Sequence, residues 1–386
     1  MSPMSKKEYL EAIQPRFKNA SKKEKTVILN EFCSTCGYHR KHAIRLLKNH
    51  KRFTNPKPKK RGKPPIYDNP SVIEPLEKIW LTANFPCSKR LKAILPIWLP
   101  FYIKEFGLLP FKIIKLLLKI SPSTINRLLK PARIKHTGRG RCTTKPGTLL
   151  KTQIPIKTNQ WDESRPGFIE ADTVAHCGTS LLGNFAYTVD FDDIATGWTE
   201  QRAVWGKGET GVLEQIKDVE ISLPFPILGF DSDNGTEFLN YHLQRHFTDR
   251  KEPVQFTRSR AYHKDDNAHI EQKNWTHVRQ LLGYDRFDNP SVIPLMNDLY
   301  TKEWRLFFNF FCPSVKLIEK KLVNGKIVKK YDLPKTPLRR ILESPDISTF
   351  TKNNLNEQFK TLNPFKLKRI IENKLKKIFS VCPARA

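Results

Sequence analysis

The sequence lacks any uninterrupted run of about 18 apolar residues, so it offers no candidate for a membrane-spanning helix. No short apolar segment follows the basic N-terminal region, as a secretory signal peptide would require. Cysteines are few, and their odd number, seven, does not favour a framework of disulfides. We therefore expect reduced thiols in an intracellular compartment, and a cytoplasmic protein.

Acidic residues are also in short supply. The chain has 38 Asp and Glu against 68 Lys and Arg, which leaves a formal net charge of +30. So large an excess predicts a polyanionic partner. An anionic membrane would attract the same charge, but the absence of long apolar runs favours nucleic acid. We therefore expect a DNA-associated protein whose partner is double-stranded DNA, with no membrane partner.

Length and composition predict several domains. A chain of 386 residues exceeds one small domain, and a hydrophobic fraction of 39% is enough for real cores. Stretches rich in Pro, Gly and basic residues divide it. The expected divisions are a helix-turn-helix module at 1–50, a basic Pro-rich linker at 51–68, a second helical or helix-turn-helix module at 69–135, a basic linker at 136–160, an α/β core at 161–310 and a basic region at 311–386.

The first 50 residues have the outline of a helix-turn-helix. Ser21 and Glu24 have the form of a capping box before an apolar-periodic segment, and Gly37 is expected to end that helix. A second, basic helix is expected at 38–48, as in helix-turn-helix DNA readers. An ordinary basic helical hairpin is the alternative. The candidate DNA contacts on the second helix are Arg40, Lys41 and Arg45.

Four residues near this turn have metal-binding side chains: Cys33, Cys36, His39 and His42. Their gaps are shorter than most zinc-finger spacings, which does not favour a zinc site. We expect instead that Cys33 is a core residue and that Cys36 belongs to the turn.

The stretch at 57–65 carries prolines too densely for helix or sheet, so we expect an extended basic linker. Lys60, Arg61 and Lys63 resemble the basic residues of peptides that lie in narrow minor grooves, where Arg is attracted by the negative potential. A solvated run of charges is the alternative, and phosphate contact is expected in either case.

Apolar, helix-sized segments follow at 73–80, 88–106 and 110–120. After them, Ser121 is expected to cap a short helix whose buried stripe includes Ile125 and Leu128. This pattern favours a second helix-turn-helix over a helical spacer, which is the alternative. Its candidate contacts to bases or phosphates are Thr124, Asn126 and Arg127.

Between residues 161 and 310 the apolar pattern predicts a mixed sheet covered by helices. Strands are expected at 168–174, 184–190, 196–204, 226–231 and 254–258. Helices are expected at 210–219, 237–247, 267–282 and 291–308. A turn is expected around Asp192-Asp193.

Acidic residues occur at strand positions of this core. Asp172 lies in the first expected strand, with Glu170 on the same face as a possible supporting acid. Asp231 and Asp233 lie at the end of the fourth strand, and strand parity does not choose between them. Carboxylates at the end of a buried strand are costly unless a cation offsets their charge.

Glu271 occupies an unexpected place on a helix. It lies on the stripe formed by Ala268, Trp275, Val278 and Leu282, which is expected to face the sheet. An acid in a buried stripe is rare without a partner. An ion pair with Lys or Arg is one explanation, and a cation shared with the strand aspartates is the other.

Three oxygen-donor side chains suit Mg²⁺ or Mn²⁺, and two such ions can activate a nucleophile and stabilise the leaving oxygen in phosphoryl transfer. We therefore expect Asp172, Glu271 and either Asp231 or Asp233 to hold two divalent ions. Cys177 beside His176 has no third group to orient the pair, which argues against a nucleophilic cysteine.

Three blocks of this core resemble the DDE transposase and retroviral-integrase superfamily, and most closely bacterial insertion-sequence transposases. The blocks are Asp172-Thr173, the stretch 232–238 (Ser-Asp-Asn-Gly-Thr-Glu-Phe) and the stretch 267–274 (Asn-Ala-His-Ile-Glu-Gln-Lys-Asn). The resemblance implies a ribonuclease-H-like fold in which Asp172, Asp233 and Glu271 are catalytic and bind the metal. It also selects Asp233 over Asp231, which is left with a supporting role.

The resemblance further implies that Asn234, Asn267 and Asn274 shape the site or contact DNA. Lys273 and Arg279 are further candidate DNA contacts, although Val278 stands where the family often has a basic residue. The implied function is DNA transposition by a homo-oligomer that cuts element ends and transfers the 3′ hydroxyl to target DNA. The alternatives are a metal-dependent nuclease without strand transfer and a DNA-binding regulator without catalysis.

The C-terminal region is basic and of uncertain role. A short hairpin with an Asn-Gly turn is expected at 321–328. Helices are expected at 333–342 and 365–379, either packed on the core or facing phosphate.

Overall fold

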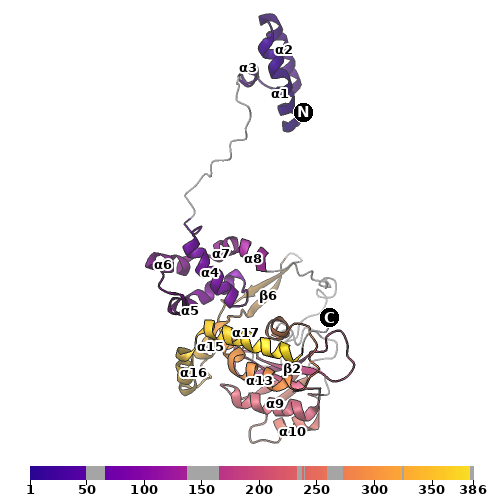
Figure 1. The fold of residues 1–386 in the computed structure, drawn as a ribbon, viewed down its shortest axis with the longest axis vertical. Helices are drawn as coiled ribbons and strands as arrows, with labels where there is room; N and C mark the ends of the chain where they lie inside the picture. Colours follow the sequence, from indigo (N-terminus) through magenta and orange to yellow (C-terminus); the bar gives the residue numbers. More distant parts are fainter. Residues whose placement is uncertain are drawn as a thin grey trace. The chain divides into compact units, whose positions relative to one another are not determined.

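The structure is a computed structural model that describes residues 1–48, 66–136, 165–232, 237–238, 240–258, 273–323 and 326–382. Residues 1–65 and 66–386 form two compact units, which are described separately (Figure 1). No helix in the described ranges is long and apolar enough to cross a membrane. Seven of the candidate residues lie outside the described ranges: Lys60, Arg61, Lys63, Asp233, Asn234, Asn267 and Glu271.

The described part of the first unit, residues 1–48, contains three helices: α1 (Pro3–Asn19), α2 (Lys22–Cys36) and α3 (Arg40–Lys48). The capping box at Ser21 and the end of α2 at Gly37, which has a φ of 67°, are confirmed. A glycine suits this left-handed position because it has no Cβ to clash. The helix α1 was not predicted.

Packing in this unit differs from expectation at the two cysteines. Cys36 is buried, with 1% exposure, beside Phe32 in the small core, whereas Cys33 is only half-buried. The prediction that Cys33 is the core residue and Cys36 the turn residue was therefore wrong. The connection to α3 begins only at Gly37, so Cys36, the last residue of α2, still faces the core.

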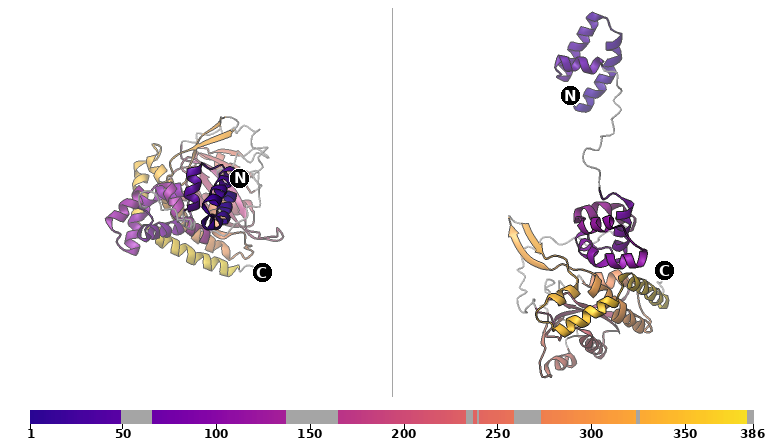
Figure 2. Two further views of the ribbon diagram at one scale, coloured as in Figure 1. Left: turned by 90° about the horizontal axis from the view of Figure 1, so that it is seen from above. Right: turned by 90° about the vertical axis from the view of Figure 1, so that its left-hand side faces the viewer.

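The second unit begins with five helices: α4 (Pro70–Thr82), α5 (Ser88–Phe106), α6 (Phe111–Lys119), α7 (Pro122–Leu128) and α8 (Lys130–His136). Ser121 caps α7 as expected, and Ile125 and Leu128 are buried. Of these helices, α4 and α5 pack against the C-terminal helix α17 (Pro364–Val381) (Figure 2). The indole nitrogen of Trp98 donates to the carbonyl oxygen of Phe311 at 3.1 Å, so the two parts share one core.

A five-stranded sheet forms the centre of the second unit, in the order β3-β2-β1-β4-β5. The strands are β1 (Phe168–Ala175), β2 (Ala186–Asp193), β3 (Thr199–Trp205), β4 (Gly229–Ser232) and β5 (Gln255–Arg258). The pairings β1–β2 and β2–β3 are antiparallel, and β1–β4 and β4–β5 are parallel. The expected mixed α/β core is therefore present.

One face of this sheet carries the buried side chains of Ile169, Phe191 and Phe230. The helices α9 (Glu209–Ser222) and α10 (Tyr241–Thr248) contribute to its cover. Phe230 packs on Phe247 with ring centroids 4.8 Å apart.

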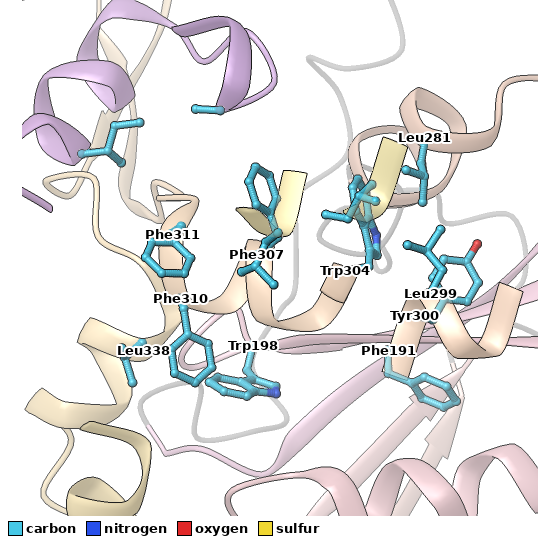
Figure 3. Packing of buried hydrophobic residues seen from close by; sticks show 14 of the residues in the cluster. Phe191, Trp198, Leu281, Leu299, Tyr300, Trp304, Phe307, Phe310, Phe311 and Leu338 are labelled. Atoms are coloured by element: carbon cyan, nitrogen blue, oxygen red, sulfur yellow. The ribbon is translucent and has the colours of Figure 1, made fainter. Parts of the chain in front are cut away.

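The other face lies under the π-helix η2 (Asn274–Arg279) and the continuous helical segment of α13 (Val292–Leu299), η3 (Tyr300–Trp304) and α14 (Arg305–Phe311). Side chains of that segment, among them Trp304 and Phe307, pack in the core that Figure 3 shows.

Two expectations for the core were wrong. Asp192 and Asp193 are the last residues of β2 instead of forming a turn, because the chain reverses only after them, between Asp193 and Thr199. Trp275 is 50% exposed and does not belong to a buried stripe, whereas Val278 and Leu282 are buried as expected. The π-helical turn changes the angle between successive side chains, so a period of 3.6 residues places Trp275 incorrectly.

The C-terminal region contains a hairpin and three helices: β6 (Leu317–Val323), β7 (Lys326–Tyr331), α15 (Pro337–Glu343), α16 (Thr349–Thr361) and α17 (Pro364–Val381). The hairpin is confirmed, with longer strands than expected. The first of these helices, α15, begins at Pro337 and not at residue 333 as expected, because Thr336 caps it. The helix α16 was not predicted. Phe365 and Ile371 of α17 are buried in the shared core.

Candidate active site

Acids separated by one residue recur in three neighbouring strands. The pairs are Glu170 and Asp172 on β1, and Asp190 and Asp192 on β2. In the third strand, β4, Asp231 is followed two positions later in the sequence by Asp233. Glu170 is the register partner of both Asp192 and Asp231, and Asp172 is the partner of Asp190. Residues paired across strands share a face, so the five described acids lie on one side of the sheet.

Asp172 is held from two directions. Its Oδ1 accepts a hydrogen bond from the backbone N–H of Thr173 at 2.7 Å, and its Oδ2 accepts one from Nδ2 of Asn274 at 2.6 Å. Asn274 is the first residue of η2, so this helix begins directly above Asp172. The structure thus brings together two candidate residues that are 102 positions apart.

The two ends of the segment 233–236 are attached close to Asp172. Ser232 is the register partner of Ala171 on β1. At the other end, Oε1 of the buried Glu237 accepts hydrogen bonds from Thr173 Oγ1 at 2.9 Å and from Lys207 Nζ at 2.7 Å. Burial raises the pKa of Glu237, but these contacts lower it overall, which keeps the carboxylate charged.

Asp231, the alternative to Asp233, is half-buried and accepts a hydrogen bond from Thr257 Oγ1 at 2.6 Å. Thr257 is its register partner on β5. This contact ties β4 to β5 and is consistent with a supporting role for Asp231.

Asp190 and Asp192 were not identified from the sequence. Asp190 is fully buried, accepts a hydrogen bond from Gln201 at 2.7 Å and has its pKa raised to about 8 by burial, against the effect of Gln201. The neighbouring carboxylates of Asp192 and Asp172 add to this increase. The repeated acid–x–acid pattern in β1, β2 and β4 is the signal that could have revealed them.

Lys273 and Arg279, both candidate DNA contacts, are turned toward the protein. Nζ of Lys273 forms an ion pair with Oδ1 of Asp192 at 2.8 Å, although the two groups are not aligned as a hydrogen bond. The same Nζ donates a hydrogen bond to the carbonyl oxygen of Gly197 at 3.1 Å. Arg279 donates to the carbonyl oxygen of Ala175 at 2.9 Å and stacks on Tyr284. These contacts fasten the start and the end of η2 to the sheet.

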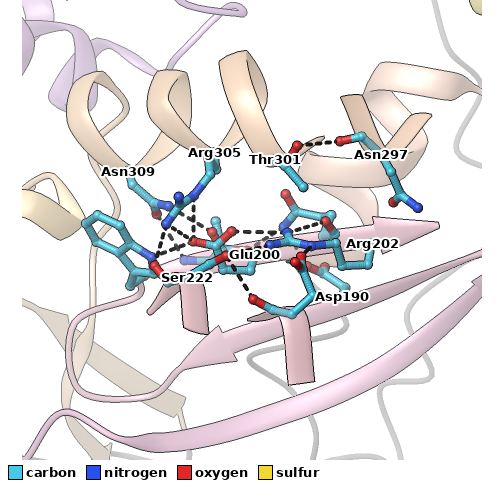
Figure 4. Close-up of polar contacts among 12 residues, drawn as sticks. Asp190, Glu200, Arg202, Ser222, Asn297, Thr301, Arg305 and Asn309 are labelled. Carbon is cyan, nitrogen blue, oxygen red and sulfur yellow. Dashed lines mark hydrogen bonds and ion pairs between the residues drawn. The ribbon is translucent and has the colours of Figure 1, made fainter. Parts of the chain in front are cut away.

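A second buried charged network lies at the edge strand β3 (Figure 4). Arg202, which is fully buried, is paired with Glu200 at 3.3 Å and Asp218 at 2.5 Å, and Glu200 is also 2.8 Å from Arg305. The charges offset one another within the protein, so we assign this network to the attachment of α9 and α14 to β3.

The remaining described DNA-contact candidates lie on helices at the surface. In the first unit, Arg40 donates to Asn30, and Arg45 donates to the carbonyl oxygen of Lys41 at 3.4 Å. All three residues of this group, including Lys41, are exposed.

In α7, Arg127 is exposed and pairs with Asp68 at 2.8 Å, and Asn126 accepts from Arg133. Thr124 is half-buried, and its hydroxyl lies 2.9 Å from Ser121 Oγ. The arrangement of these side chains does not by itself assign a DNA contact.

Among the described residues, no group of three or more His, Cys, Asp or Glu side chains is placed to hold a metal ion. Two of the three expected ligands, Asp233 and Glu271, lie outside those residues.

No model of a known protein family matches the chain. The chain is similar to catalytic cores of retroviral integrases. The HTLV-2 integrase core in complex with magnesium is 15% identical, with a TM-score of 0.27, over 42% of this chain and 92% of that chain. The BIV integrase core is 12% identical, with a TM-score of 0.25, over 37% of this chain and 83% of that chain. Scores this low do not by themselves establish a shared fold.

A much closer relative comes from the bacterium Sinorhizobium fredii (strain NBRC 101917 / NGR234). Its uncharacterized protein y4rM is 36% identical over 342 residues, which cover 88% of this chain and 96% of the relative. The matched length exceeds that of the second unit, so the similarity reaches into both units. The chain therefore belongs to the same protein family as the uncharacterized protein y4rM of Sinorhizobium fredii.

Proposed function

We propose that the protein is a DDE-type DNA transposase with a ribonuclease-H-like core, in which Asp172, Asp233 and Glu271 form the metal-dependent site. It would cleave the ends of a transposable element and join the freed 3′ hydroxyl to target DNA. The observation that carries the proposal is the meeting of β1, β4 and the start of η2 at Asp172.

The register of the sheet supports Asp233 as the second acid. In the parallel pair β1–β4, Phe168 is opposite Gly229, an offset of 61 positions (229 − 168). Asp231 is the partner of Glu170. In the sequence, Asp233 follows Asp231 by two positions, just as Asp172 follows Glu170 by two. The attachment of Glu237 to Thr173, beside Asp172, also supports this assignment.

The hydrogen bond from Asn274 supports Glu271 as the third acid. Glu271 precedes Asn274 by three residues, and Asn274 touches Asp172 directly. Lys273, between them, is fastened to Asp192 and Gly197 on the same side of the sheet. The chain is thus constrained on the C-terminal side of Glu271 to the immediate surroundings of Asp172.

The donor set fits Mg²⁺ or Mn²⁺, since the site offers carboxylate oxygens and no sulfur or imidazole ligand among the proposed residues. When bound, such ions supply charge neutralisation and a nucleophile at neutral pH. The protein's own contribution is to hold the carboxylates. Asn274 and the Thr173 N–H orient Asp172, and the buried pair of Lys273 with Asp192 fixes the start of η2.

DNA binding is supported by the net charge of +30 and by two helical modules before the core. We propose that the helices α3 and α7 contact element ends and that the active form is a homo-oligomer on paired DNA ends. Light scattering of the protein with and without end-containing duplexes would test the second point, and a strictly monomeric complex would contradict it.

The direct test incubates the purified protein with Mg²⁺ and duplexes that carry the terminal inverted repeats flanking the gene. We expect nicked and joined products, separated on denaturing gels. Asp233→Asn should lower both by at least about a hundred-fold, because it removes a ligand for the transition-state charge. DNA binding, measured without divalent ions, should stay within about two-fold of wild type.

Two further variants sharpen the test. Asp231→Asn should keep measurable cleavage, and Glu357→Gln, an exposed carboxylate on α16, should leave it unchanged. Loss of cleavage in Asp231→Asn with retention in Asp233→Asn would move the ligand to Asp231. Nicks without joined products would favour a nuclease, and binding without either product would favour a regulator.

A further inference from the structure

The hairpin of β6 and β7, residues 317–331 and here called the ribbon, projects from the second unit (Figure 2, right). Of the ribbon side chains that the structure describes, none is buried and only Glu319 is half-buried. Leu322 is 72% exposed, Ile318 61% and Val328 52%. A two-stranded hairpin with both faces in water is at best marginally stable alone, so a partner surface would stabilise it.

The root of the ribbon is rigidly attached. Ser314 and Lys335 exchange two backbone hydrogen bonds of 2.9 and 3.1 Å beneath it. Asp332 accepts from the backbone N–H of Lys316 at 2.6 Å and pairs with Arg340 at 2.5 Å. Nζ of Lys316 donates to the carbonyl oxygen of Ala195 at 2.9 Å, in the turn after β2. The ribbon is therefore anchored to the same sheet that carries Asp172.

The root also lies beside the acidic face. Leu317 and Tyr331, the first register pair of the ribbon, line a cavity of about 290 Å³ together with Asp192 and Lys273. A polymer that follows the ribbon toward its root would thus arrive next to the acids of β2. The base of the ribbon is fixed while its remaining described side chains are exposed, so a bound polymer would be directed toward the acidic face.

The charge of the ribbon identifies its partner. Residues 317–331 contain five lysines and one glutamate, a surplus of four positive charges (5 − 1). Lys321, Lys329 and Lys330 are exposed in the structure, and Lys321 pairs with the only acid, Glu319, at 2.6 Å. Lysine stems combined with exposed aliphatic side chains suit a polyanion that also offers apolar surface, as the DNA groove does.

We infer that the ribbon is a DNA-binding arm that enters a groove of duplex DNA and guides the duplex toward the acidic face. A two-stranded β-ribbon fits the major groove, which is about 12 Å wide. Val328 is the register partner of Lys321 and lies on its face of the ribbon, whereas Leu322 lies on the other face, with Lys329. One face would turn toward the bases, and the exposed lysines would contact phosphates along the groove. The choice of DNA as the polymer rests on the proposed function.

The test compares two full-length triple variants that lose the same charge. The ribbon variant is K321A/K329A/K330A, and the matched control is K366A/K376A/K377A, which removes three exposed lysines of α17. Affinity for a random-sequence duplex is measured by fluorescence anisotropy, in EDTA, at several salt concentrations. EDTA prevents cleavage, so the result does not depend on catalysis.

Three lost phosphate contacts should reduce the slope of log K against log salt by about 2.7, at about 0.9 per contact. Between about 50 and 200 mM salt, wild type should therefore lose roughly 40-fold more affinity than the ribbon variant. The control should change the slope by less than about 1. An unchanged slope in the ribbon variant, or an equal change in the control, would overturn the inference.

Protection of lysines from acetylation gives a second, local measurement. DNA should protect Lys321, Lys329 and Lys330 from acetylation, read by mass spectrometry, more than Lys376 and Lys377. Protection of the ribbon without DNA that increases with protein concentration would instead make it a contact between subunits and overturn the inference. If duplex binding depends on the ribbon but wild type never cleaves DNA, the proposed function fails and the ribbon assignment stands.

Discussion

Burial determines the charge of several single residues around the sheet. His176 is fully buried, and its Nε2 lies 2.7 Å from Oγ1 of Thr188, which in turn lies 2.9 Å from the hydroxyl of Tyr300. Burial, together with the charge of Arg279, lowers the pKa of His176 to about 3. The imidazole therefore stays neutral in the folded protein at neutral pH, and it links the residue after β1 to β2 and η3.

This buried histidine predicts acid sensitivity. The unfolded chain protonates His176 below about pH 6.5, whereas the folded protein does not until about pH 3, so stability should fall as pH drops through that window. At pH 5 the loss from this residue is about 2 kcal/mol, since the pH is 1.5 units below the ordinary value. Denaturant unfolding at pH 5 and pH 7 measures it. His176→Gln should reduce the difference, and the surface variant His136→Gln should not.

The ion pair of Lys273 and Asp192 predicts a large cost when one partner is removed. Their side chains are only 13% and 5% exposed. Lys273→Met leaves the carboxylate of Asp192 buried without its cation, so we expect a loss of about 3 kcal/mol in the free energy of unfolding. Adding Asp192→Asn should restore part of the loss in a double-mutant cycle. Additive losses would mean that the two side chains do not interact energetically.

At the scale of elements, the entry to β1 controls how β1 and β4 meet. Gly167 has a φ of 114°, and a Cβ there would lie 2.5 Å from the carbonyl oxygen of Pro226 and 2.9 Å from Cγ of Leu228. The N–H of Gly167 donates to Oδ1 of Asp193 at 2.7 Å. The close approach of these backbones sets the β1–β4 register on which the position of Asp172 depends.

Gly167→Ala should therefore be strongly destabilising, by about 2–4 kcal/mol, because both the backbone conformation and the contact with Pro226 oppose a Cβ. Gly208→Ala is the matched control, since nothing lies within 4 Å of its Cβ position and its φ is −71°. Denaturant midpoints of the two variants check the prediction. Equal, small effects would show that β1 can shift without cost.

At the scale of the whole molecule, the chain divides at residue 65. The first unit has its own small core, which includes Leu10, Ile28 and Phe32. The helices α4–α8, in contrast, share the core of the second unit, where Trp98 packs on Phe307, Phe311 and Phe365. The second helical module is therefore part of the core unit instead of an independent module.

Removal of residues 1–65 should leave the melting temperature of the second unit unchanged within a few degrees, because the cores are separate. Calorimetry should show one transition fewer than in the full chain. The same truncation should lower the affinity for element-end DNA more than the affinity for random DNA. A large drop in the melting temperature would show that the units stabilise one another.

Much of the core could be predicted from local pattern. The apolar segments around Phe168, Phe230 and Phe256 identified β1, β4 and β5, and the capping residues Ser21 and Ser121 located helix starts. The acids Asp172, Asp233 and Glu271 were identified as candidates from their places in strand and helix patterns and from the family resemblance. The pattern failed at Trp275, where a π-helical turn changes the period, and at Asp192, where a strand continues through acids.

The sequence by itself therefore indicated the strands of the core, many of the helices and the candidate acids, since caps, periodicity and turn residues act over a few neighbouring positions. Only the tertiary structure decided which distant groups are partners. Asn274 meets Asp172, Lys273 meets Asp192, and Trp98 meets Phe311, which is 213 residues away. Such pairs depend on how the sheet and helices pack, and among 68 basic residues no local rule selects the one that pairs with a given acid.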